Sequence, residues 1–119
     1  TTDEMLANNQ DVLVRYLTGS ARGWGYARKN PEEAVDHLVA EYRNLDQASE
    51  LKAVKPVLGF SFDSTTAKDG WAAMNRENWQ VQIETYASLD QFQGEVPSVD
   101  DVMTQDILSA TESIRREVG

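Results

Sequence analysis

The sequence predicts a mostly helical chain that folds as a single unit over residues 1–119. Apolar residues recur at helical steps of three and four in several segments. Between these segments lie residues that typically begin or end helices, such as Asn30-Pro31. Strand signals are few and short, and no repeat, low-complexity tract or linker divides the chain. We therefore expect about five helices and no full sheet.

The first helix is expected to begin near residues 8–10 and to run to about Lys29. Three glycines, Gly19, Gly23 and Gly25, interrupt it, and each costs about 1 kcal/mol relative to alanine inside a helix. We expect either close approach of another backbone along the Gly19/Gly23 edge or a kink between Gly19 and Gly25. One helical face carries the recurring residues Leu13, Tyr16, Leu17, Ser20, Trp24 and Ala27.

The second helix is predicted from Pro31 to about Tyr42. Proline suits the first helical turn because its missing N–H would lack a helical partner there anyway. Asn30 can cap the helix, and Glu32 and Glu33 lie where the helix dipole favours anions. Its apolar face is Ala34, Val35, Leu38, Val39 and Tyr42.

A third helix is expected after Asp46, which is a good N-terminal cap. Pro56 predicts that this helix bends or ends early. Residues 59–74 are expected to form the longest irregular stretch. Within it, the alternation of Phe60 and Phe62 favours a short extended segment.

The last two helices are also predicted from their caps. Asn75 is expected to begin a helix that ends near Leu89. Ser98 and Asp101 resemble a capping box in which aspartate replaces the usual glutamate. A final helix is expected after Thr104. It would carry on one side Ile107, Leu108, Thr111 and Ile114.

The composition restricts the classes of function. The net charge is −9, so no basic stripe for nucleic acid is visible and an anionic membrane surface is disfavoured. The absence of cysteine excludes disulfides, thiolate catalysis and cysteine-based zinc sites. No phosphate-binding glycine loop is present, and we predict no cofactor.

Candidate metal and catalytic residues are sparse. Glu33, His37 and Glu41 follow one another at steps of four, and a carboxylate–imidazole pair at this spacing can bind a divalent metal. The alternative, which we favour, is a solvated acidic face with a pH-sensitive histidine, so we predict no metal site. His37 is the single histidine and no elbow-type serine motif accompanies it, so we assign no catalytic residue.

Aromatic residues near the helix breaks are the candidates for ligand binding. Trp24 and Trp79 lie on apolar stripes and are expected in the core. Tyr26 and Trp71 lie off these stripes and can wall a cleft that binds a flat ring. Arg22 can hold an anionic ligand. Core packing at helix ends, or a solvated helix face for Arg22, remains the alternative for each.

Several segments together resemble one protein family in the order in which they occur. The segment 22–27 (Arg-Gly-Trp-Gly-Tyr-Ala) and the following 30–35 (Asn-Pro-Glu-Glu-Ala-Val) are the most similar to it. The ordered set resembles the C-terminal portion of NMT1/THI5-like (SsuA/THI5-like) periplasmic substrate-binding proteins of ABC transporters. The segment 75–80 departs from the family pattern because it lacks a proline. The other similar segments are 8–17, 70–71 and 102–108.

The resemblance implies a type II periplasmic-binding fold, in which two α/β lobes close on a ligand. This chain would be the helical C-terminal segment of that fold and a fragment of a larger protein. The start at Thr1 without an initiating methionine fits a processed or excised product. An apolar face normally covered by the sheet would then be exposed, and the fragment would self-associate.

The resemblance also implies a function. The ligand would be a small molecule: a thiamine pyrimidine precursor, riboflavin or a similar compound, with a sulfonate or nitrate less favoured. The membrane partner would be an ABC-transporter permease, and the location would be periplasmic or extracellular, with a lipoprotein anchor as an option. Two alternatives stay open: a thiamine-pyrimidine-synthesis enzyme of the THI5 type, and a free-standing helical interaction domain.

Overall fold

The computed structural model describes all residues from Thr1 to Gly119 and contains nine α-helices and no strands. Helices hold 73% of the residues, which confirms the mostly helical prediction. The helices are α1 (Asp3–Asn8), α2 (Gln10–Lys29), α3 (Pro31–Glu41), α4 (Gln47–Ser61), α5 (Ser64–Asp69), α6 (Arg76–Ser88), α7 (Val99–Val102), α8 (Asp106–Ala110) and α9 (Glu112–Val118).

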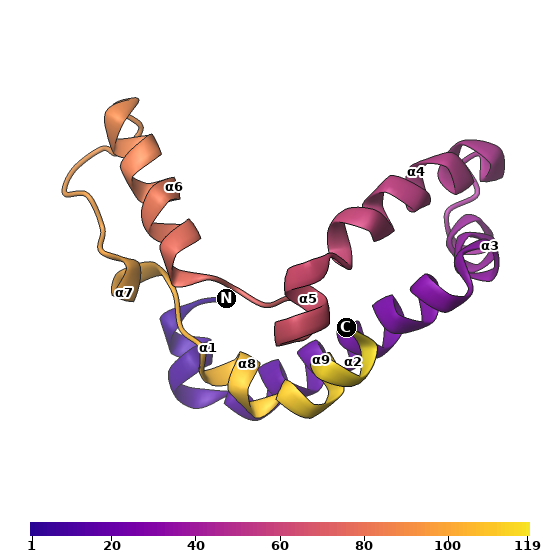
Figure 1. The fold of residues 1–119 in the computed structure, drawn as a ribbon, viewed down its shortest axis with the longest axis horizontal. Helices are drawn as coiled ribbons and strands as arrows, with labels where there is room; N and C mark the ends of the chain where they lie inside the picture. Colours follow the sequence, from indigo (N-terminus) through magenta and orange to yellow (C-terminus); the bar gives the residue numbers. More distant parts are fainter.

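The helices form a base with two arms (Figure 1). The long helix α2 lies in the base beside α8 and α9, and α1 joins it at one end. One arm consists of α3 and α4, which pack against each other, and the other consists of α6 and α7. Helix α5 returns to the base and packs against α9. The base that connects the two arms is therefore built from both ends of the chain, α1 and α2 from one end and α8 and α9 from the other.

Little of this chain is buried. Only nine of the 119 residues are buried, and the radius of gyration is 17.1 Å. A compact domain of this length would have a radius of gyration of about 13.5 Å. The arrangement is thus more open than a single globular core would make it. The buried apolar residues are Ala21, Val35, Ile83, Val99 and Leu108.

The predicted caps begin their helices as expected. The Asp46 carboxylate accepts from the Ser49 N–H at 2.9 Å, and the Asn75 side chain accepts from the Glu77 N–H at 2.7 Å. The Asp101 carboxylate accepts from the N–H of Ser98 at 2.8 Å, the back-reaching half of the predicted capping box. Each of these bonds satisfies an N–H that the helix itself leaves without a partner.

Asn30 lies at the predicted boundary between α2 and α3, but its side chain caps the end of α2 rather than the start of α3. Its side chain accepts no bond from α3; instead its amide donates to the Tyr26 carbonyl oxygen at 3.2 Å. The carbonyl groups of the last turn of α2 lack helical partners, and this amide satisfies one of them. Asn30 therefore closes α2, while Pro31 begins α3.

Four predictions about helix number and ends were wrong. The chain has nine helices rather than about five, because short helices occupy segments expected to be irregular. Helix α4 does not end early at Pro56 but continues to Ser61, since the proline removes the N–H donor of one residue and the next turns remain bonded. Residues 64–69 form α5, because the Asp63 carboxylate accepts from two backbone N–H groups at 2.9 Å each. The final helix divides at Thr111.

The close approach predicted along the Gly19/Gly23 edge of α2 occurs instead at Gly25. Open space surrounds Gly19 and Gly23, and α2 is continuous from Gln10 to Lys29. The close approach occurs at Gly25, where an added Cβ would lie 2.7 Å from a methyl carbon of Val118. The sequence shows three equivalent glycines, but only Gly25 faces α9.

Candidate binding groove

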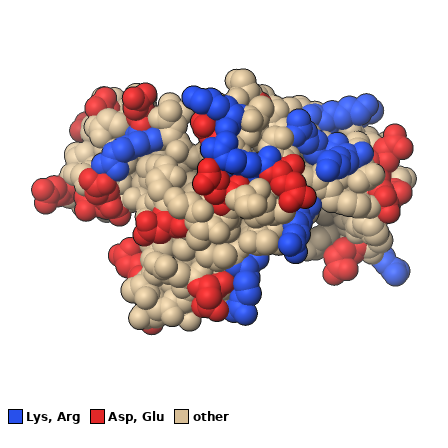
Figure 2. All heavy atoms as spheres, turned by 60° about the horizontal axis from the view of Figure 1, so that its bottom comes forward, with Lys and Arg blue, Asp and Glu red and all other residues tan.

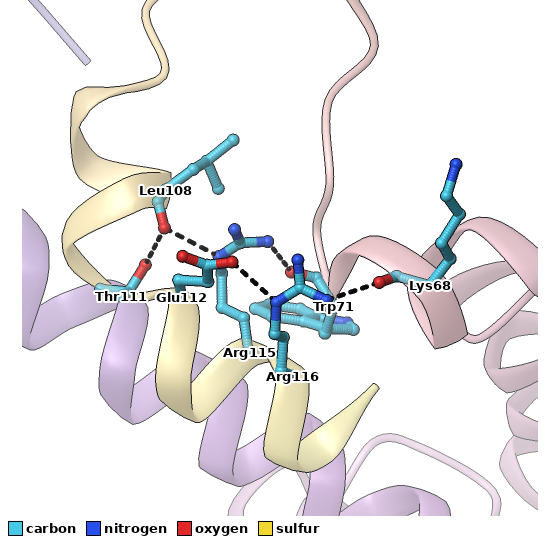
Figure 3. Close-up of polar contacts among 7 residues, drawn as sticks. All are labelled: Lys68, Trp71, Leu108, Thr111, Glu112, Arg115 and Arg116. Atoms are coloured by element: carbon cyan, nitrogen blue, oxygen red, sulfur yellow. Dashed lines mark hydrogen bonds and ion pairs between the residues drawn. The ribbon is translucent and has the colours of Figure 1, made fainter.

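Trp71 belongs to a structural clasp between the segment after α5 and the last helix (Figure 3). Its ring stacks on that of Trp24, with the ring centroids 6.1 Å apart. Its N–H donates to the Arg115 carbonyl oxygen at 2.9 Å, and its own carbonyl oxygen accepts from the Arg115 guanidinium at 2.8 Å. These two hydrogen bonds and the stacking on Trp24 fix Trp71 against α9, and they explain its position without a ligand-binding role.

Arg115 and Arg116 complete this clasp from α9. Arg115 is only 5% exposed, and its Nε donates to the Leu108 carbonyl oxygen at 3.2 Å. Burial lowers the pKa of Arg115 from its ordinary value, but the group stays protonated at neutral pH. Arg116 donates to the Lys68 carbonyl oxygen at 2.7 Å and pairs with Glu112 at 2.7 Å (Figure 3). The C-terminal helix α9 is thus bonded to α5, to the segment after α5 and to α8.

Arg22 and Tyr26, the other two predicted site residues, share a shallow cavity of about 370 Å³ between α2 and α9. Interaction with the Glu33 carboxylate, followed by desolvation, raises the pKa of the exposed Tyr26 hydroxyl. Trp71 does not line this cavity. The structure therefore brings Arg22 and Tyr26 together and places Trp71 elsewhere. The lining also includes Gly25, Lys29, Asn30, Ile114, Glu117 and Val118.

A larger groove lies at the opposite end of the base and was not predicted. It has a volume of about 570 Å³ and is formed by α1, the first half of α2, the chain before α6 and the segment from α7 to α8. Nine of its fourteen lining residues are hydrophobic. We call it the apolar groove. Its lining is Thr1, Asp3, Leu6, Leu13, Tyr16, Leu17, Met74, Asp100, Asp101, Val102, Met103, Thr104, Ile107 and Leu108.

Carboxylates lie along the apolar groove. Arg76 pairs with Asp100 at 2.7 Å, and this bond, followed by the charge of Arg76, lowers the pKa of the Asp100 carboxyl. Bonds from the hydroxyl and N–H of Ser98 lower the pKa of Asp101. Both groups are therefore ionised at neutral pH. With Asp3, they add three carboxylates to a lining that is otherwise mostly apolar.

The sequence pattern identifies some of the residues that line the groove, but it does not predict the groove itself. Leu13, Tyr16 and Leu17 belong to the predicted face of α2, and residues 102–108 form one of the segments that carry the family resemblance. These two segments lie about 90 positions apart in the chain. Only the tertiary fold brings them together, because α8 packs beside α2.

Other candidate chemistry is not assembled in the structure. His37 lies 4.0 Å from Glu33, and both side chains are largely exposed. Nowhere do three or more His, Cys, Asp or Glu side chains gather as potential metal ligands. None of the helices combines the length and the apolar character that a membrane span requires.

Neither the models of protein families, nor the curated proteins, nor the solved structures gave a match to this chain.

Proposed function

We propose that this chain is the helical C-terminal segment of the solute-binding component of an ABC importer, of the NMT1/THI5-like kind. The ligand of the whole protein is a small molecule, such as a thiamine pyrimidine precursor, riboflavin or a related ring compound. The permease is its membrane partner, and its place is periplasmic or extracellular. The ordered family-like segments support this proposal, and the helix content agrees with it.

The observation that carries the proposal is the small extent of burial. A chain with 40% hydrophobic residues that buries nine of 119 leaves apolar surface for another part of a protein to cover. Phe60, at the end of α4, is 87% exposed. Helices that cover one side of a sheet in a two-lobed protein would have such faces. The large apolar side chains with substantial exposure also include Tyr42, Val57, Val81, Tyr86 and Leu89.

Within this proposal, the residues of the chain have two roles. The clasp of Trp71 and Arg115 holds the C-terminal helix against α2 and α5. The cavity beside it presents Arg22 and Tyr26, which supply part of the wall of the ligand cleft. A guanidinium group can bind an anionic substituent, and a phenol ring can lie against a flat heterocycle.

The test uses the full-length gene product in a thermal-shift screen against thiamine pyrimidine precursors, riboflavin and alkanesulfonates. A ligand at 100 times its dissociation constant stabilises the folded state by about 2.7 kcal/mol, so a true ligand raises the melting temperature clearly. The double variant Arg22→Ala, Tyr26→Ala should weaken this shift, whereas Glu41→Gln, at the exposed end of α3, should not.

Three results would contradict the proposal. The first is no stabilisation by any of these ligands well above micromolar concentration. The second is formation of the thiamine pyrimidine from pyridoxal phosphate and iron, which would identify the enzyme alternative. The third is a monomeric 119-residue chain with a cooperative melt, which would identify a free-standing interaction domain.

A further inference from the structure

The negative charge of this protein is concentrated at one end. Residues 1–15 and 75–106, which we call the acidic end, contain ten carboxylates and two basic residues. Both basic residues are already paired, Arg15 with Asp11 and Arg76 with Asp100. The remaining residues contain nine basic and ten acidic groups. The acidic end therefore has a charge of −8, out of −9 for the whole chain.

The surface shows the same asymmetry. In Figure 2, red side chains dominate the left part of the molecule, and most blue side chains lie at the centre and right. Helices α1, α6 and α7, which belong to the acidic end, lie on that left side in Figure 1. Like charges concentrated on one side of a molecule attract a partner of opposite charge and speed its association.

The apolar groove lies within this acidic end. Leu13, Leu17 and Ile107 line it from α2 and α8, and Met74 and Met103 add flexible side chains that adapt to different shapes. Tyr16 lines the groove and is 75% exposed, so its ring is free to cover a bound molecule. The groove thus combines a mostly apolar lining with the carboxylates of Asp3, Asp100 and Asp101.

We propose that the apolar groove binds a basic amphipathic helix of a partner protein. A helix with an apolar stripe fills such a groove, and its flanking lysine or arginine side chains meet the surrounding carboxylates. An anionic membrane would be repelled by the acidic end. A second copy of this chain has no strongly basic surface to offer, because its other residues are nearly neutral. The site is separate from the Arg22/Tyr26 cavity and does not depend on a solute ligand.

The experiment measures binding of two fluorescently labelled peptides to the full-length gene product. Each has about 18 residues with leucines at helical spacing; the other positions are lysine in one peptide and glutamate in the other. Fluorescence anisotropy should show binding of the lysine peptide and none of the glutamate peptide at the same protein concentration. Raising the salt from about 0.05 M to 0.5 M should weaken the binding by about tenfold, because the ion contacts are exposed and screened.

Matched variants locate the site. Tyr16→Ser removes an exposed aromatic from the groove and should weaken lysine-peptide binding by about fivefold or more. Phe60→Ser removes an equally exposed aromatic from the end of α4, outside the groove, and should change the affinity by less than about twofold. Asp3→Asn should weaken binding and reduce its salt dependence. Both aromatic side chains are mostly in solvent, so neither change should alter the helical circular dichroism.

Several outcomes would overturn the inference. Equal binding of the glutamate peptide would show a hydrophobic surface without charge selection. Equal loss in Tyr16→Ser and Phe60→Ser would place binding outside the groove. Absence of lysine-peptide binding at about 100 μM protein would exclude the site at any useful affinity. The peptide measurements contain no solute ligand, so their outcome is independent of the ligand screen. Peptide binding can be absent while a solute stabilises the protein, and peptide binding can be present while no solute does.

Discussion

Arg115 shows how a single buried charge can hold distant segments without an acidic partner. Its guanidinium donates to the carbonyl oxygens of Leu108 and Trp71, and its own carbonyl oxygen accepts from the Trp71 N–H. These bonds join α8, α9 and the segment after α5. Since the chain buries so few residues, such a polar junction contributes a large share of its tertiary order.

We expect Arg115→Lys to destabilise the protein. Arg115 reaches the two carbonyl oxygens from separate nitrogens, Nε and Nη1, whereas lysine carries its donors on one nitrogen and does not reproduce both positions, so we expect one of the two bonds to be lost. The expected loss is about 1–3 kcal/mol in the free energy of unfolding, measured by urea denaturation followed by circular dichroism. Arg22→Lys, at an exposed position, is the control and should change the stability by less than about 0.5 kcal/mol. Equal effects of the two variants would argue against the junction.

Replacing two of the glycines by alanine should change the stability of the protein in opposite directions. Gly70 has φ +89°, and an added Cβ would lie 3.1 Å from the backbone of Arg115 and Arg116, so Gly70→Ala should destabilise by about 1–3 kcal/mol. Gly19 lies inside α2 with open space around it, so Gly19→Ala should stabilise by up to about 1 kcal/mol. Melting temperatures of the two variants test this directly. A stabilising Gly70→Ala would contradict the described turn.

At the scale of elements, side-chain caps decide where most helices begin. Asp46, Asp63 and Asn75 each accept backbone N–H bonds from the first turn of the following helix. They explain where α4 and α6 begin, and why α5 appears where a loop was expected. Asp46 and Asp101 also make stability depend on pH.

We expect acid to weaken the helices capped by Asp46 and Asp101. Bonds from Ser49 and Ser98 lower the pKa of these carboxyls in the folded chain, so their contribution is complete above their ordinary value near 3.8. The contribution is lost as the pH falls below about 4 and through the lowered folded pKa. Melting temperatures between pH 6 and about 2.5 measure this loss.

The variant Asp46→Asn keeps a helix cap at this position but removes the group that titrates. Asparagine keeps an acceptor for the Ser49 N–H but does not ionise, so the variant should lose less stability than the original protein as the pH falls. Glu117→Gln, which removes an exposed carboxylate from α9, is the control. An unchanged pH profile in Asp46→Asn would show that other groups cause the acid sensitivity.

At the scale of the whole molecule, the two arms leave broad helix faces in solvent. The principal extents are 45 × 33 × 28 Å, and the α3–α4 and α6–α7 arms project from one base (Figure 1). Few long-range contacts hold either arm, so each should open at a lower free energy than the base. The same openness provides the surface on which the proposed function depends.

We therefore expect the isolated 119-residue chain to self-associate and to bind an apolar dye. Light scattering should show a mass that rises with concentration, and dye fluorescence should exceed that of a compact protein of equal length. The double variant Phe60→Ser, Val81→Ser should reduce both signals, because Phe60 is 87% exposed and Val81 60% exposed, and neither lines the apolar groove. A constant monomer mass with no dye binding would contradict the proposed fragment character.

The sequence by itself determined the long helices and several helix starts. Helical spacing of apolar residues predicts the long helices, and Asp46, Asn75 and the Ser98–Asp101 pair predict the starts of α4, α6 and α7, because caps act within a few residues. The clasp and the groove were decided only by the tertiary structure. Trp71 meets Arg115 across 44 positions, and Leu17 shares the groove with Ile107 across 90. Such pairs depend on how α8 and α9 pack beside α2, and neither the spacing nor the propensity of nearby residues encodes that packing.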